Sequence, residues 1–132
     1  FATAAKAAGV EHFLVVTAVS ANPNASAFYS RVKGHTEQQL GEIGFSRLDI
    51  VRPGLLLGDR KEHRLIEALL QRLAPAIDLL MRGKWRRYRS VQAVSVGRCL
   101  LELAANTAPG VFTHHFDDIM TVLRSASPVT TK

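Results

Sequence analysis

Two short apolar runs with an amphipathic segment between them constrain the fold of this chain most strongly. Residues 13–17 and 46–51 each have the length and apolar content of a buried strand. Residues 25–43 have the apolar spacing of a helix and are followed by Gly44, which suits a helix C-cap. This order predicts a parallel α/β sheet, in which ligands bind beyond the carboxyl ends of the strands.

The same alternation continues through the chain, which at 132 residues is one domain at most. Residues 4–9 are the end of a helix, and residues 62–81 form a long amphipathic helix that Pro75 kinks or divides. We then expect a strand over 87–91, a helix over 94–105, a strand over 110–116 and a helix over 117–125. Asp117 caps that last helix, and residues 127–132 are a frayed tail.

A Tyr-x-x-x-Lys pair lies near the start of the first predicted long helix. Tyr29 and Lys33 are four residues apart, so on a helix they share one face. Thr17 adds a hydroxyl at the carboxyl end of the preceding strand. These groups suit proton transfer to and from a carbonyl oxygen, because the ammonium favours the phenolate, and the accompanying hydride requires a nicotinamide cofactor. Taken alone, the pair is also typical of an ordinary surface helix.

Three segments around this pair resemble the short-chain dehydrogenases/reductases. Residues 4–17 resemble the helix and strand before their active site, residues 29–34 the active-site helix, and residues 45–54 the next strand with its Arg-Pro-Gly loop. The resemblance is to the atypical, small members of the Tat-interacting-protein and NmrA-like kind, related to NAD-dependent epimerases/dehydratases. It implies an α/β fold with a Rossmann-type doubly wound parallel sheet.

The resemblance also implies a role for each matching residue. Tyr29 is the acid/base, and Lys33 assists it and holds the ribose hydroxyls of the nicotinamide. Thr17 takes the position usually held by a serine, and Ser20, further along the loop, is a second candidate for the orienting hydroxyl. The remaining cofactor contacts come from the Arg-Pro-Gly loop: Arg52, Pro53 and Gly54.

The Gly-rich turn that holds the pyrophosphate in that family has no counterpart among the nine glycines. The chain also begins at Phe1 inside an apparent helix, so we expect residues 1–132 to be the C-terminal part of one NAD(P)-binding domain, lacking its N-terminal strands. The missing N-terminal half of the domain is then a partner of this chain. Without that half, the sheet would expose an apolar edge to water, so we expect that the chain does not fold stably alone. The cofactor is NAD(P), with NADP slightly favoured.

The positive charge of the chain raises the question of whether it binds nucleic acid or another anionic partner. The formal charge is +6, and its densest cluster is a basic stretch with interleaved aromatic residues: Arg82, Lys84, Trp85, Arg86, Arg87, Tyr88 and Arg89. Such a stretch binds nucleic acid in some proteins, but a solvated loop or a patch facing the missing half is the simpler interpretation. An acidic substrate, an acidic protein or an anionic membrane surface are further options.

Isolated features support no other site. His114 and His115 point to opposite faces of a strand, so we expect no metal site there. Cys99, alone and among apolar neighbours, is expected to be buried and inert, and its isolation favours the reducing cytoplasm. No apolar run approaches the length of a membrane span.

The function expected from these observations is NAD(P)H-dependent oxidoreduction of a small-molecule carbonyl or alcohol. The alternative is a non-catalytic regulator that binds NAD(P) as a redox signal and acts through protein partners. The resemblance also allows a homodimer, because in larger relatives the active-site helix often packs in a helical dimer interface. We do not expect nucleic acid to be the main partner.

Overall fold

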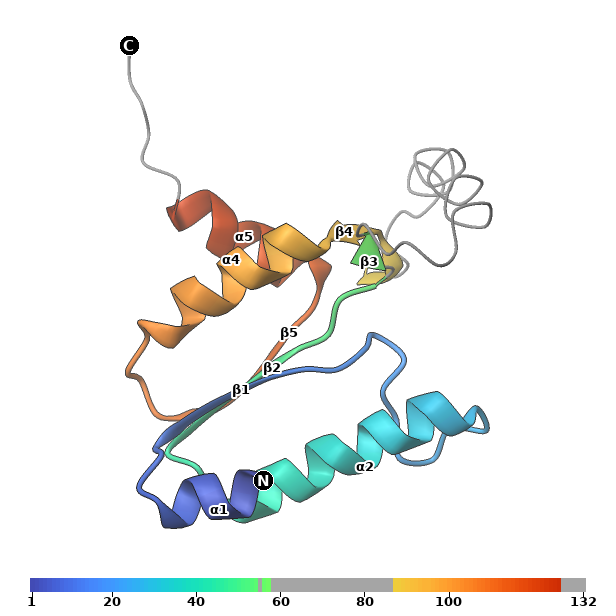
Figure 1. Cartoon of the computed structure of the whole chain (residues 1–132). Coiled ribbons are helices and arrows are strands. Elements are labelled where there is room, and N and C mark those ends of the chain that lie inside the picture. Colours follow the sequence, from blue (N-terminus) through green and yellow to red (C-terminus); the bar gives the residue numbers. More distant parts are fainter. Residues whose placement is uncertain (55, 58–86, 127–132) are drawn as a thin grey trace.

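The computed structural model describes residues 1–54, 56–57 and 87–126 (Figure 1). The expected helix over 62–81 with Pro75, most of the basic stretch from Arg82, and the tail over 127–132 lie outside these residues. In the described part, no helix is long and apolar enough to cross a membrane.

Three parallel strands form the central sheet, as the strand–helix–strand pattern predicts. Their order is β1 (His12–Val16), β2 (Arg47–Val51) and β5 (Gly110–His114). Figure 1 shows helices on both faces: α1 (Ala2–Ala7) and α2 (Phe28–Ile43) on one, α4 (Ala93–Ala104) and α5 (Phe116–Ala126) on the other. This arrangement confirms the α/β fold class and matches part of a Rossmann-type sheet. A second, two-stranded parallel sheet joins β3 (Leu56–Leu57) to β4 (Val91–Gln92).

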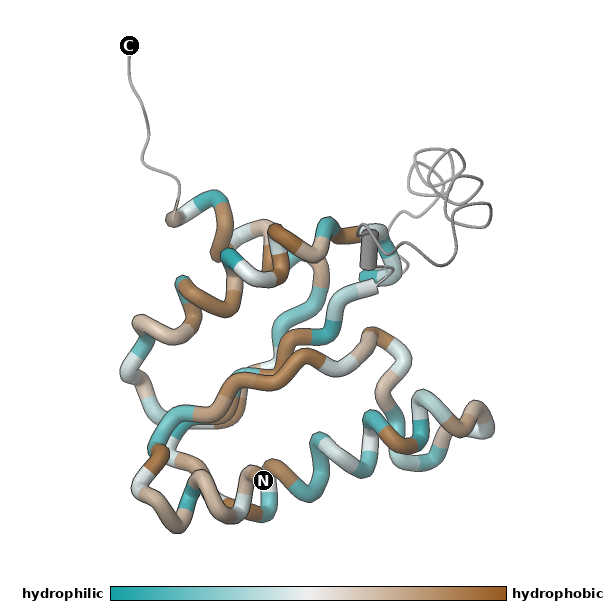
Figure 2. The backbone as a smooth tube through the Cα atoms, in the orientation of Figure 1, coloured by the Kyte–Doolittle hydropathy of each residue, from teal (hydrophilic) through white to brown (hydrophobic). Residues whose placement is uncertain are grey.

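Alternate residues of the strands supply two separate cores, because successive side chains in a strand point to opposite faces. The core under α4 and α5 contains Val51, Val91, Val96, Cys99, Leu103 and Ile119. The core over α1 and α2 contains Leu40, Phe45, Leu48 and Ile50. In Figure 2 the apolar colour is accordingly concentrated along the strands and on the helix sides that face them.

One local expectation is confirmed and two are wrong. Gly44 ends α2 in the left-handed conformation, with φ of 76°. The expected strand over 87–91 is instead the short β4, preceded by a turn at 87–89 whose carbonyls lie against Gly54. Asp118, rather than Asp117, caps α5: its carboxylate accepts the His115 backbone N–H at 2.9 Å.

The three strands differ in how well they are covered. Every residue of β2 is buried, those of β1 are all partly exposed, and β5 is mostly exposed. Within the described residues β1 pairs with β2 alone, so its other edge is open. The prediction that this piece does not fold stably by itself remains a prediction.

Candidate active site

Three polar residues follow the carboxyl ends of the three strands. Val16, Val51 and His114 are in register across the sheet. The ladder continues one step further, because Thr17 donates its N–H to the Val51 carbonyl and Arg52 donates its N–H to the His114 carbonyl, both at 2.9 Å. Thr17, Arg52 and His115 therefore leave the sheet at the same edge, where α/β proteins bind ligands.

A buried carboxylate on α2 ties two of these residues together. Glu37 is 7% exposed and accepts bonds from the Thr17 hydroxyl and from Nε of Arg52, the latter at 3.0 Å. A second Arg52 nitrogen, Nη2, pairs with the other Glu37 oxygen, so the contact is bidentate. We call Thr17, Glu37 and Arg52 the Glu37 cluster. Arg52, expected to contact the cofactor, thus has its guanidinium held by a residue of α2.

Tyr29 and Lys33 lie together on α2, as their spacing predicts. The Lys33 Nζ is 5.7 Å from the centroid of the Tyr29 ring, and Tyr29 is 59% exposed. Glu37 continues the same i, i+4 stripe by one further turn. The stripe therefore runs from an exposed phenol, past an ammonium, to a buried carboxylate at the end of the sheet.

The loop between β1 and α2 is packed closely on the helix. A Cβ added at Gly34 would lie 2.2 Å from the Asn22 carbonyl carbon, which shows how near the two backbones come. The Asn22 N–H donates to the Ser30 carbonyl at 3.0 Å, and the Ser30 hydroxyl donates to Ser20 Oγ at 2.9 Å. These contacts fix the loop that carries Ser20, the second candidate hydroxyl, against the turn that carries Tyr29.

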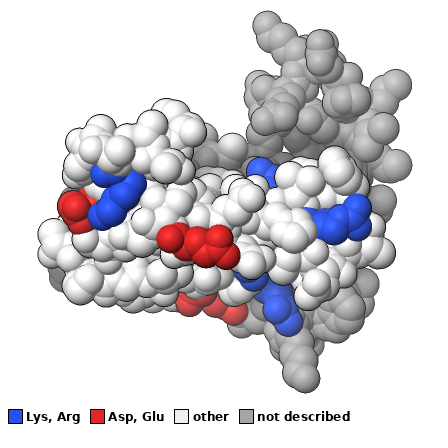
Figure 3. Space-filling view, turned by 90° about the horizontal axis from the view of Figure 1, so that it is seen from below, with Lys and Arg blue, Asp and Glu red and all other residues white. Residues whose placement is uncertain are grey.

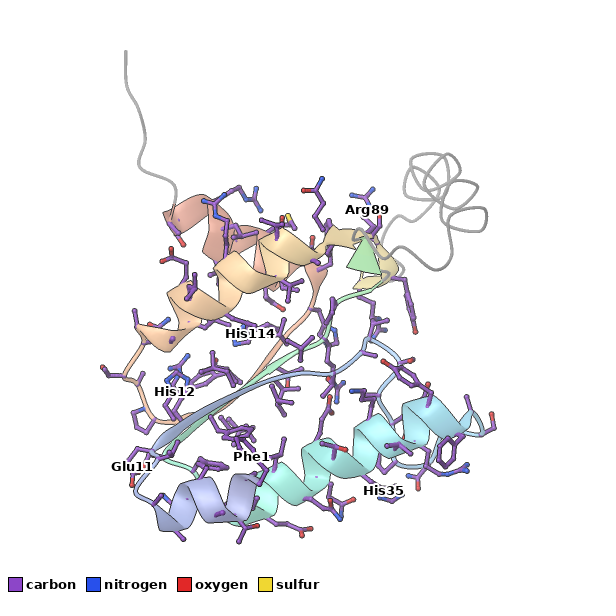
Figure 4. All side chains as sticks on the ribbon, viewed as in Figure 1. Phe1, Glu11, His12, His35, Arg89 and His114 are labelled. Atoms are coloured by element: carbon purple, nitrogen blue, oxygen red, sulfur yellow. The ribbon has the colours of Figure 1, made fainter. Side chains whose placement is uncertain are left out.

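The Arg-Pro-Gly loop is fixed in a similar way. The Pro53 carbonyl accepts the Val19 N–H at 3.0 Å, which joins this loop to the loop after β1. A Cβ at Gly54 would lie 2.4 Å from the Arg89 carbonyl oxygen, so the turn at 87–89 passes directly over it. Arg89, labelled in Figure 4, also lies 5.9 Å from the Phe116 ring at the start of α5. The loop after β1, the Arg-Pro-Gly loop and the turn at 87–89 are thus joined to one another.

His115 is the third residue at this edge. Its Nδ1 is buried and has no hydrogen-bond partner among the described residues. Burial lowers the pKa of the imidazole, and the positive charges of Arg52 and Arg87 lower it further. Neither His115 nor Glu37 is recognisable from the sequence alone, since a single His or Glu in such a segment usually faces solvent.

A second buried polar cluster lies on the opposite face of the sheet, under α4. Asp49 is fully buried and accepts bonds from Arg47 Nε at 2.5 Å, His12 Nε2 at 2.7 Å and His114 Nε2 at 2.7 Å (Figure 4). Burial alone raises the pKa of this carboxyl, but the bonds from Arg47 and the two histidines outweigh it and the pKa is lowered. We call these four residues the Asp49 cluster.

The ligand-type side chains of the two clusters are not arranged as a metal site. Among the described residues no three His, Cys, Asp or Glu side chains are arranged to hold a metal ion. Cys99 is buried, as expected, and burial raises the pKa of its thiol to about 11, so it stays protonated at neutral pH.

Charged side chains are dispersed over the face that α1 and α2 cover. Figure 3 shows Lys and Arg groups there separated by Asp and Glu groups, with no continuous field of one sign. The formal charge of +6 therefore does not gather on this face as a nucleic-acid-binding surface would require.

Comparison with known proteins gives relatives that match part of their own length. The chain is 33% identical over 106 residues to Protein HTATIP2 of Rattus norvegicus, and the aligned region covers 80% of this chain and 42% of that protein. It is 33% identical over 97 residues to Protein FMP52, mitochondrial, of Coccidioides immitis, covering 74% and 39%. It is 35% identical over 82 residues to Protein fmp52, mitochondrial, of Aspergillus niger, covering 62% and 35%. No protein-family model matches the chain.

These relatives agree in part with the sequence-based resemblance. FMP52 and HTATIP2 proteins are homologues of this chain, which spans about two fifths or less of their length. The expectation of a cytoplasmic location is wrong: several of the fungal relatives are named as mitochondrial proteins. A single cysteine indicates a reducing environment, but it does not distinguish one reducing compartment from another.

Proposed function

We propose that this chain is the catalytic part of an NAD(P)H-dependent oxidoreductase of the atypical short-chain dehydrogenase/reductase kind. The observation that carries the proposal is the Tyr29–Lys33 pair, which lies on α2 next to the loop that follows β1, with the phenol exposed and Lys33 Nζ 5.7 Å from its ring. The homology to FMP52 and HTATIP2 proteins supports it. The substrate is a small-molecule carbonyl or alcohol.

In this mechanism Tyr29 moves the proton. Its hydroxyl donates to the carbonyl oxygen of the substrate during reduction, and its phenolate takes the proton back during oxidation of the alcohol. The Lys33 ammonium would stabilise negative charge on the phenol oxygen and would hold the ribose hydroxyls of the cofactor. The nicotinamide, when bound, supplies or accepts the hydride. Pro53 and Gly54 would lie beside the ring by their backbone.

The two candidate hydroxyls suit different tasks. Thr17 donates its hydrogen to Glu37, so its oxygen remains as an acceptor for a substrate hydroxyl. Ser20 accepts the bond from Ser30, which leaves the Ser20 hydrogen to donate to a substrate carbonyl. We therefore assign orientation of the alcohol to Thr17 and orientation of the carbonyl to Ser20.

The test is a fluorescence titration with NADPH, followed by turnover of a panel of small carbonyl compounds. Tyr29→Phe should keep cofactor binding and lower turnover by about 10²–10⁴-fold, the usual contribution of a general acid. Phe28→Leu, at the neighbouring exposed position, is the matched control and should change neither quantity. Loss of NADPH binding in Tyr29→Phe, or unchanged turnover, would contradict the assigned role.

The same variant separates the enzyme from the redox-sensing regulator. A regulator that acts through protein partners needs the bound cofactor but not the proton of Tyr29, so its biological effect would survive Tyr29→Phe. If the chain alone does not bind NADPH, the site for the pyrophosphate lies in a part of the protein that this chain does not contain.

We further propose a mitochondrial location, since fungal relatives carry that word in their names. Fractionation of cells that express the natural protein, followed by detection with an antibody, is the direct check. Recovery in the cytosolic fraction would contradict it.

A further inference from the structure

At the carboxyl ends of the strands lies a buried polar atom that has no role in the proposed reaction, Nδ1 of His115. Buried polar atoms in folded proteins almost always have a hydrogen-bond partner. Nδ1 of His115 is buried and has none within residues 1–54, 56–57 and 87–126. The residue also stands directly after β5, at the ligand-binding edge, so a group of the ligand is a natural partner for it.

Two arginines lie close to this imidazole from different segments. Arg52 leaves β2 beside it, because the Arg52 N–H is bonded to the carbonyl of His114, the preceding residue. Arg87 belongs to the turn at 87–89 that is held over Gly54 and against the start of α5. Both guanidinium groups contribute to the electrostatic potential at the ring.

Burial and the charges around His115 act together to lower the pKa of its imidazole. Arg52 and Arg87 act on the imidazole more strongly than the two carboxylates that face it, Asp118 and Glu37. Although Arg52 is paired with Glu37, its charge is therefore not cancelled at this position. A positive potential beside a buried, unpartnered ring nitrogen favours an anion over a neutral hydroxyl, because the anion gains from both.

We propose that Arg52, Arg87 and His115 form a binding site for an anionic group, a carboxylate or a phosphate, on the ligand. The ring donates a hydrogen bond from Nδ1 to an anionic oxygen, and the guanidinium groups balance the charge. This inference rests on the proposed function, because that function places the active site here. It adds that the substrate is a carbonyl or alcohol compound that carries an acidic group. The same chemistry is also present in the phosphates of the cofactor.

The experiment is an NMR titration of the protein with labelled histidine rings, using inorganic phosphate as the probe. His115→Asn assigns the ring signal, and it retains a polar atom near the position of Nδ1. Bound phosphate should move the titration of His115 to higher pH, because an anion stabilises the imidazolium form. Arg87→Gln should weaken phosphate binding about tenfold, as expected for loss of one charge-assisted contact. Arg98→Gln, at an exposed position on α4, should leave it unchanged.

The outcomes decide the proposal without reference to turnover. A His115 signal whose titration phosphate does not alter overturns it, as does an equal response in Arg87→Gln and Arg98→Gln. Simultaneous binding of phosphate and NADPH would support an acidic group on the substrate, whereas competition between them would assign the anion to the cofactor and overturn the acidic substrate. Because phosphate binding needs no nicotinamide, failure of the oxidoreductase proposal would appear separately, in the NADPH titration.

Discussion

The Asp49 cluster and the Glu37 cluster lie on opposite faces of one sheet and differ in how far their polar atoms are satisfied. On the α4 side, both oxygens of Asp49 are bonded, by Arg47 and by one histidine from each neighbouring strand. On the α2 side, Glu37 is also paired, but its charge acts on His115, whose buried Nδ1 has no hydrogen-bond partner among the described residues. Complete pairing indicates a structural role, and incomplete pairing at a strand end indicates a ligand.

The largest expected effect comes from breaking the saturated cluster. Asp49→Asn keeps the shape of the side chain but leaves Arg47 as a buried charge without its carboxylate. Removing one partner of a buried pair typically costs about 3–5 kcal/mol, so we expect a loss of that size in the free energy of unfolding. Urea denaturation measures it, with Glu102→Gln on the exposed side of α4 as the control. A change below about 1 kcal/mol would show that the cluster is not structural.

Glu37→Gln tests the other cluster and should cost less. Arg52 has a side chain that is 25% exposed, so water compensates part of the lost ion pair. We expect a loss of about 2 kcal/mol, from two hydrogen bonds to a charged group and a partly hydrated arginine. NADPH affinity, if the chain binds the cofactor, should also fall because α2 loses its tie to the strand ends. A cost equal to that of Asp49→Asn would remove the contrast between the two faces.

The comparison also shows what a sequence can predict. The strand–helix–strand order and the shared face of Tyr29 and Lys33 follow from local spacing, and both are present in the structure. The Asp49 cluster does not follow from it, because Asp49 and His114 are 65 positions apart and meet only when β2 and β5 pair. Arg47 and Asp49 alternate with apolar residues, which is typical of a strand with one face in water; α4 and α5 cover that face instead.

The candidate site was partly predictable for a similar reason. A Tyr-x-x-x-Lys pair carries its own spacing signal, whereas Glu37 and His115 become meaningful only through residues contributed by other strands. Arg52 illustrates the limit: its position at the strand end followed from the sequence, but its pairing with Glu37 depends on the packing of α2 on the sheet.

Gly34→Ala tests the packing of the loop after β1 on α2. The added methyl group would lie 2.2 Å from backbone atoms of Asn22 and Pro23, which are not free to rotate away. Overpacking of this kind costs about 1–3 kcal/mol and should push apart the loop and the turn that carries Tyr29. Gly41→Ala, on the same helix with nothing within 4 Å, should stabilise by about 0.5–1 kcal/mol. Thermal unfolding of the pair compares them; a similar sign for both would mean that the loop contact is not tight.

His115→Leu should have the smallest effect on stability, and its pH dependence sharpens the contrast between the clusters. Removing an unpartnered buried nitrogen forfeits no hydrogen bond within the described residues, so near pH ~8 we expect a change within about 0.5 kcal/mol. The pKa of His115 is lowered in the folded chain. As the pH decreases below the ordinary value of ~6.5, the unfolded chain therefore binds the proton first, and the free energy of unfolding decreases. The leucine variant lacks this contribution and should lose less stability than the wild type on acidification.

The pH window separates this effect from that of Asp49. The pKa of the Asp49 carboxyl is also lowered on folding, so its contribution is complete above the ordinary value of ~3.9 and is lost only as the pH falls through the folded value. The Asp49 carboxyl stays ionised between pH ~8 and pH ~5, so the difference between His115→Leu and the wild type in urea unfolding at these two pH values reports on His115. His35→Gln, at an exposed position on α2 (Figure 4), is the control. If His115→Leu and His35→Gln respond equally to this change of pH, the imidazole at the strand end is not held uncharged by its surroundings.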